Sequence, residues 1–87
     1  MTDKEKEQNE EMGELTRSDI IDIIDSIKYY ADENHALLLK HPKDEYYGTC
    51  NDVYYAVLDA IQNQLIMKDR EPADYNLGEN LDEKYLK

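Results

Sequence analysis

The chain contains few of the residues that usually stabilise a small domain. Its 87 residues include one cysteine, no tryptophan, no phenylalanine and only three glycines. A single cysteine excludes an internal disulfide, so apolar packing has to hold the fold together. The length allows one domain at most, and the few glycines form no phosphate-binding loop. These absences leave a small hydrophobic core as the expected source of stability.

Basic residues are scarce as well. Ten Lys and Arg stand against 21 Asp and Glu, which gives a net charge of -11. The basic residues are scattered along the sequence, so no basic patch is available to release counterions from phosphates. The composition therefore argues against direct nucleic-acid binding and indicates a surface that attracts basic proteins.

Long apolar runs are also missing. No run approaches the roughly 20 apolar residues that a membrane-spanning helix needs. The N-terminal residues are charged and lack the apolar segment of a secretory signal. We therefore expect a cytoplasmic protein without a membrane partner.

Charge and apolar residues are unevenly distributed along the chain. Residues 1–14 contain six acids and two lysines, with Met1 and Met12 as their only apolar residues. Such a segment buries too little surface to offset its ordering entropy. We predict a disordered acidic leader (1–14), a helical hairpin (15–69) and a semi-ordered tail (70–87).

The first part of the hairpin has the periodicity of an amphipathic helix. Its apolar stripe consists of Ile20, Ile23, Ile24, Ile27, Tyr30, Ala31, Leu37 and Leu38. Thr16 and Asp19 have the spacing of a capping box at its start, and Pro42 predicts its end. Asn34 falls on the stripe and marks either a polar core residue or a break. We favour one helix, with a kink at Asn34 left open, over two shorter helices, 16–32 and 35–41.

The second part of the hairpin repeats this pattern. Residues 42–48 (PKDEYYG) predict a loop, and Thr49 with Asp52 offers a second capping pair. The following helix is expected to run to about residue 69, before Pro72. Its apolar face consists of Val53, Tyr54, Val57, Leu58, Ile61 and Leu65. Two long amphipathic helices joined by a short loop predict an all-α antiparallel hairpin.

The tail offers a third layer. Asn80 and Glu83 have the spacing that caps a short C-terminal helix. Its apolar residues, expected to fold back over the hairpin, are Leu77, Leu81, Tyr85 and Leu86. The burial of about fifteen apolar side chains at best nearly offsets, and otherwise falls short of, the backbone entropy lost by about 55 ordered residues. The hairpin therefore needs its tail, a second copy that completes a helical bundle, or a partner.

An acidic stripe is the first candidate contact surface. It consists of Asp22, Asp25, Tyr29, Asp32 and Glu33. Steps of three and four residues place these side chains on one face, opposite the isoleucines. The steps span about 4.5–6 Å along a helix, close to the phosphate spacing of a nucleic-acid strand. The stripe predicts a phosphate-mimicking surface, with a merely solvated helix face as the simpler alternative.

Tyrosine is the main aromatic residue, with eight in the chain. Neighbours on a helix point about 100° apart, so one ring of each helical pair should be buried. Tyr30 and Tyr54 are the expected inward rings, and Tyr29 and Tyr55 the outward ones. Exposed tyrosines are favoured anchors of protein interfaces.

The predicted loop forms a second candidate surface. It carries Asp44, Glu45, Tyr46 and Tyr47, and rings that merely cover the hairpin end are the alternative. His41–Pro42 followed by these residues is similar to the H-P…Y-Y stretch of the immunity proteins of DNase colicins and pyocins. Those proteins are small acidic helical inhibitors of nucleases, so the resemblance implies a nuclease as partner. The D-L-I-Y-Y-P form of that family, and its longer segment before H-P, are absent.

Metal sites are not predicted. His35, His41 and Cys50 do not have the spacing of zinc ligands, and the acids near residue 44 do not follow a calcium loop. Cys50 lies on the apolar side of its helix, which favours a core residue over a reactive thiol. We expect no metal and no cofactor.

One short motif points to catalysis. Glu10–Glu11–Met12–Gly13–Glu14 is similar to the E-E-x-x-E motif of all-α nucleoside triphosphate pyrophosphatases, which bind magnesium. The later E-x-x-D motif of that family would fall on Thr49–Asp52, where the first carboxylate is absent. We therefore expect no enzymatic activity.

These observations favour a non-enzymatic acidic binding protein. It would inhibit or regulate a basic, nucleic-acid-handling protein, such as a nuclease, by occupying its positive surface. The alternative is an assembly module that forms a homodimeric four-helix bundle, in which the acids provide only solubility.

Overall fold

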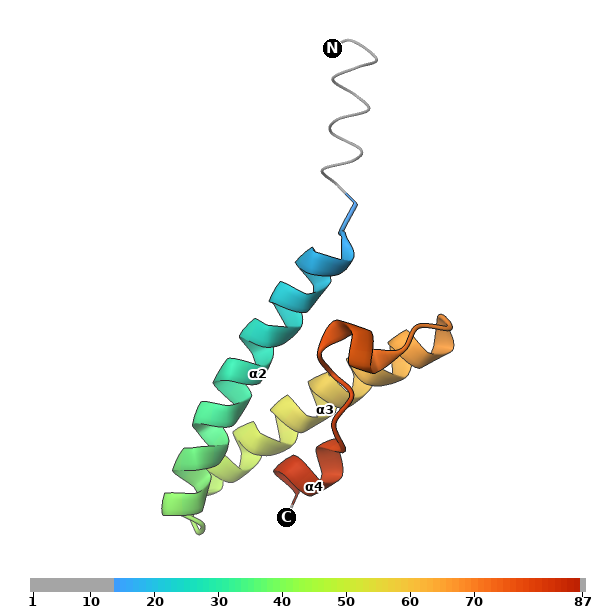
Figure 1. Cartoon of the computed structure of the whole chain (residues 1–87). Helices are drawn as coiled ribbons and strands as arrows, with labels where there is room; N and C mark the ends of the chain where they lie inside the picture. The colour runs from blue at the N-terminus through green and yellow to red at the C-terminus, as the bar shows by residue number, and fades with distance from the viewer. Residues whose placement is uncertain (1–13, 87) are drawn as a thin grey trace, which may run out of the picture.

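The computed structural model describes residues 14–86, which form a helical hairpin covered on one side by the tail. Helix α2 (Arg17–Lys40) and helix α3 (Glu45–Met67) run antiparallel, followed by the 3-10 helix η1 (Pro72–Tyr75) and helix α4 (Leu81–Tyr85). Figure 1 shows α2 and α3 diverging from the end at which they are joined. The described residues contain no strand, which confirms the predicted all-α hairpin. The predicted leader lies, apart from Glu14, outside them.

Helix α2 begins where its capping pair predicts. The Asp19 backbone N–H donates to Thr16 Oγ1 at 3.0 Å, and the Thr16 N–H donates to Asp19 Oδ2 at 3.1 Å. The helix continues through Asn34 without a break and ends at Lys40, two residues before Pro42. The preference for one helix is therefore confirmed.

Helix α3 begins earlier than predicted. Asp44 is its N-cap and accepts a hydrogen bond from the Tyr46 backbone N–H at 2.9 Å. The predicted loop over residues 42–48 is therefore wrong in its second half, and Thr49 lies inside the helix. The reason is local: an aspartate cap followed by Glu45 in the first turn suits the positive end of the helix dipole. That combination outweighs the cost of a helical Gly48.

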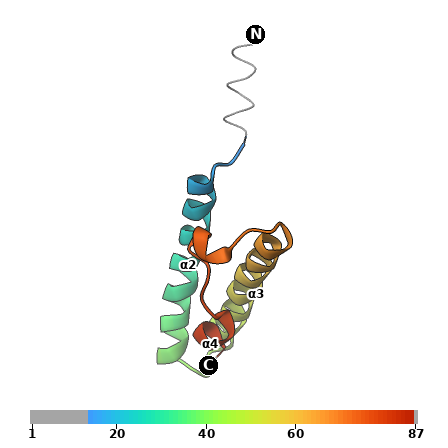
Figure 2. The ribbon, with the colours of Figure 1, turned by 45° about the vertical axis from the view of Figure 1, so that its right-hand side comes forward.

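The tail supplies half of the buried apolar core. The buried core side chains are Ile24, Ala31, Leu58 and Leu65 from the hairpin, and Tyr75, Leu77, Leu81 and Tyr85 from the tail. In Figure 2 the tail runs from η1, at the open end of the hairpin, to α4, near its closed end. Only Leu86 departs from the predicted third layer, because its side chain remains 49% exposed.

Ion pairs join the tail to helix α2. Lys28 Nζ lies 2.8 Å from a carboxylate oxygen of Glu79 and donates to the Asn76 carbonyl at 2.6 Å. Lys84 Nζ lies 3.3 Å from both Glu79 and Asp32. Burial raises the pKa of Glu79, but hydrogen bonds from the two lysines outweigh it and lower that pKa overall. The tail is therefore fixed by charge as well as by apolar contact.

Close backbone packing in the tail gives a first prediction. A Cβ added at Gly78 would lie 2.9 Å from the Ala73 Cβ and 3.0 Å from its Cα. Gly78→Ala should therefore destabilise the protein by about 1–3 kcal/mol, because η1 has to shift. A Cβ added at Gly48 meets nothing within 4 Å, so Gly48→Ala should stabilise helix α3 by about 0.5–1 kcal/mol. Urea unfolding checks both variants, and a neutral Gly78→Ala would show that η1 is not packed as described.

Candidate interaction surfaces

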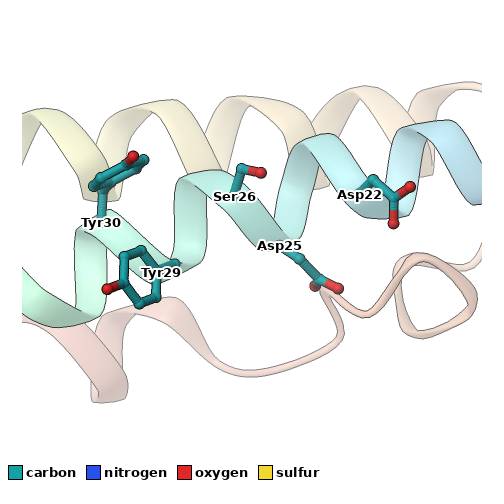
Figure 3. A pocket seen from close by; sticks show the side chains of 5 residues that line it. All are labelled: Asp22, Asp25, Ser26, Tyr29 and Tyr30. Carbon is teal, nitrogen blue, oxygen red and sulfur yellow. The ribbon is translucent and has the colours of Figure 1, made fainter.

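The acidic stripe lies on the side of α2 that faces away from the core. All five of its residues are exposed. Figure 3 shows the first three residues of the stripe, with the Asp25 side chain directed toward the tail and Tyr30 on the opposite edge of the helix. A shallow hollow in this region is lined by Asp22, Asp25, Ser26, Tyr29 and Tyr30. The structure therefore brings the predicted stripe residues together on one face.

Two of the stripe carboxylates have partners inside the protein. Asp25 Oδ1 accepts a hydrogen bond from the Asn76 side chain at 2.7 Å. Asp32 Oδ1 accepts one from the Tyr85 hydroxyl at 2.6 Å and pairs with Lys84. These two acids hold the tail against α2, a role that the sequence did not reveal because the partners lie about 50 residues away.

The remaining stripe residues face solvent. Asp22 and Glu33 form no ion pair with the other residues of 14–86. The Glu33 carboxylate accepts a hydrogen bond from Tyr29, which raises the pKa of the tyrosine hydroxyl. Asp22, Tyr29 and Glu33 therefore form the part of the stripe that is free to contact a partner, and we call them the acidic face.

The orientation of Tyr30 differs from the prediction. Its ring was expected to point inward but is 57% exposed, and it packs edge-on against Tyr29 at 5.3 Å between ring centroids. The hairpin packs along the line of Ile24 and Ala31, and the tail covers one flank of that line. Tyr30 lies on the other flank, which no described residue covers.

Tyr55 also differs from the prediction, whereas Tyr54 is partly buried as expected. Tyr55 was predicted to point outward, but it packs against the core and donates a hydrogen bond to Asp82 in the tail. That hydrogen bond raises the pKa of Tyr55 to about 12. For Tyr85, burial and the hydrogen bond to Asp32 likewise raise the pKa to about 12. Both hydroxyls thus serve to attach the tail.

The second predicted surface lies in the first turn of α3 rather than in a loop. Asp44 is occupied as the helix cap, and the ring of Tyr47 is half-buried beside His41. Glu45 and Tyr46 remain exposed, and the Tyr46 ring has an exposed fraction of 70%. These residues lie at the closed end of the hairpin, whereas the first two turns of α2, which include Asp22, lie toward its open end (Figure 1). The two predicted surfaces therefore lie on different helices, and they approach each other near Glu33, where the neighbouring Asn34 donates to the Tyr47 carbonyl.

A buried polar cluster, which the sequence indicated only at Asn34, connects the hairpin to α4. The Asn51 side-chain amide donates to the Tyr85 carbonyl at 2.8 Å. Its Oδ1 lies 3.0 Å from His35 Nδ1, which must therefore carry the proton. Asn34 donates to the Tyr47 carbonyl at 3.0 Å. Each of these donors has an acceptor within the protein.

A largely apolar surface on the flank opposite the tail was not predicted, because its residues other than Tyr46 were assigned to the core. We call it the open face, and its large exposed side chains are Ile23, Tyr30 and Leu37 of α2 and Tyr46, Val53 and Val57 of α3. Where the helices diverge, this face contains a hollow of about 300 Å³ lined by Ile20, Ala60, Ile61, Gln64, Leu65 and Lys68. The periodicity of these residues is visible in the sequence, but only the tail's position shows which flank stays uncovered.

Comparison with known proteins identifies no relative from which a function could be inferred. The chain matches no protein-family model, no curated protein and no solved structure. Across the part of the chain that the structure describes, no three His, Cys, Asp or Glu side chains are grouped so that they could hold a metal ion. No helix among residues 14–86 has the length and apolar character needed to cross a bilayer.

Proposed function

We propose that the protein is a non-enzymatic acidic binding protein that inhibits or regulates a basic, nucleic-acid-handling protein. The acidic face of α2 would occupy the positive surface on which that partner holds phosphates. The observation that carries the proposal is the position of Asp22, Tyr29 and Glu33, which stay exposed after the tail has docked.

The charge of the whole chain supports this role. Residues 14–86 contain 16 acidic and seven basic residues, and Lys28 and Lys84 are used in pairs with the tail. The field near the acidic face is therefore negative, which accelerates encounter with a basic protein. Tyr29 adds a large ring that is 58% exposed and can be buried at the contact. Charge would then govern the rate of association, and the ring the lifetime of the complex.

Capture from a lysate of the source cells tests the proposal. The immobilised protein should retain a basic nucleic-acid-binding protein, which elutes as salt rises because exposed charges are screened beyond about 8–10 Å. Adding the protein should also displace a fluorescent oligonucleotide from the captured partner. Capture of proteins that are neither basic nor displaced from nucleic acid would contradict the proposal.

Two double variants make the comparison specific to the acidic face. Asp22→Asn with Glu33→Gln should lower the association rate with the captured partner by about three- to tenfold at low salt. Asp52→Asn with Asp69→Asn changes the charge equally at exposed positions elsewhere and should have a smaller effect. We avoid Asp25 and Asp32, since their replacement would also loosen the tail. Equal effects of the two double variants would place the contact elsewhere.

A further inference from the structure

The open face has the pattern of a surface that packs against other helices. Ile23, Tyr30 and Leu37 lie seven residues apart on α2, and Tyr46, Val53 and Ala60 lie seven apart on α3. Ile27, Asn34, Cys50, Val57 and Gln64 occupy the positions four residues on from these. Alternating steps of four and three on antiparallel helices are typical of the seams of helical bundles.

Apart from Lys68 at the hollow, the open face also lacks charge. None of these eleven positions holds Asp, Glu, Lys or Arg, although 36% of the chain is charged and about four charges would be expected by chance. Depletion of charge at the centre is typical of protein interfaces. The face borders the acidic face where Tyr30 packs against Tyr29, but the two faces consist of different side chains.

No segment among residues 14–86 covers this face. The tail is already packed on the opposite flank. Outside residues 14–86, the sequence offers Met1 and Met12 as its only apolar side chains. The exposed apolar side chains of this face are therefore available to a second polypeptide.

We propose that this second polypeptide is another copy of the same chain, and that two hairpins pair through their open faces into a four-helix bundle. The margin of the face along α3 consists of Thr49, Ala56 and Asn63, which are exposed and uncharged. A highly acidic copy can approach such a margin without placing like charges in contact, whereas a basic partner would gain nothing there. This inference does not rest on the proposed function.

The exposed side chains and the shape of the open face, which has a protruding ring at one end and a hollow at the other, fit a two-fold dimer. Its six large side chains are each 38–70% exposed, and a standard interface buries about 800 Å² on each partner. The Tyr46 ring projects at the closed end, and the hollow beside Ile20 and Leu65 lies at the open end. An antiparallel two-fold arrangement would place the partner subunit's Tyr46 over this hollow. The first subunit's Tyr46 would then cover the same hollow of the partner, as an isologous interface requires.

Sedimentation equilibrium of the full chain from micromolar to millimolar concentration tests the dimer. The wild type should approach twice the 10.3 kDa mass of the chain. Val53→Lys places a charge in the centre of the face and should raise the dissociation constant at least about tenfold, since that charge would be buried without a partner. Asn63→Lys makes the same charge change on the exposed margin of the same helix and should still dimerise.

Loss of dimerisation can be distinguished from unfolding of the variant. Val53 is 56% exposed, so the variant should keep its helical circular dichroism, and Ile23→Lys serves as a second variant if it does not. A wild type that is monomeric at every concentration overturns the proposal. So does a charged open-face variant that dimerises as tightly as Asn63→Lys.

Discussion

Removing residues 71–87 should abolish cooperative folding of the hairpin. The deletion takes away Tyr75, Leu77, Leu81 and Tyr85, which are half of the buried core. Four such side chains contribute about 1.5–3 kcal/mol each, a sum comparable to the entire stability of a small domain. The deletion also removes the Tyr85 carbonyl that accepts a hydrogen bond from Asn51. Far-UV circular dichroism at micromolar concentration should show a large loss of helix and no sigmoidal thermal transition.

The matched control removes residues 1–13, which contribute only two apolar side chains to the sequence. We expect its thermal midpoint to stay close to that of the full chain. A truncated hairpin that still melts cooperatively, within a few degrees of the full chain, would contradict the view that the tail completes the core.

Replacing Asn51 with alanine should be the most damaging single substitution of a polar residue. The side chain is 3% exposed, donates to the Tyr85 carbonyl and accepts from His35. Its loss leaves a buried carbonyl and a ring N–H unpaired, so we expect the free energy of unfolding to fall by about 2–4 kcal/mol. Urea unfolding measures the change, and hydrogen exchange should show α4 opening before the two long helices.

Asn63→Ala on the same helix is the control. Asn63 is exposed, and its hydrogen bond to Asp59 at 3.3 Å joins neighbouring turns of α3. We expect a change within about 0.5 kcal/mol. Equal effects at positions 51 and 63 would show that the link between α3 and α4 does not stabilise the protein.

Local signals in the sequence predicted the helices well. The capping pair Thr16 and Asp19, and the cap at Asn80, work as expected because each depends only on residues three apart. The start of α3 was predicted too late, since Thr49 and Asp44 both resemble caps and sequence spacing does not rank them. The acid beside Asp44 in the first turn decided between them.

Contacts between distant segments were not predictable. The acidic stripe was placed on the correct face, but nothing near Asp25 or Asp32 in the sequence points to Asn76 or Tyr85. The predicted orientation of Tyr30 was wrong for a related reason. The apolar stripe of α2 is wider than the line that packs against α3, and only the tail's position shows which flank remains open.

The central claim, that the acidic face of α2 contacts a basic partner, is tested most directly by zero-length carbodiimide cross-linking of the captured complex. This chemistry joins a carboxylate to a lysine only where the two form a close ion pair. Mass spectrometry should locate the cross-links at Asp22 and Glu33, and their yield should fall as salt rises. Cross-links concentrated at Asp52 or Asp59 of α3 instead, with none at Asp22 or Glu33, would contradict the account.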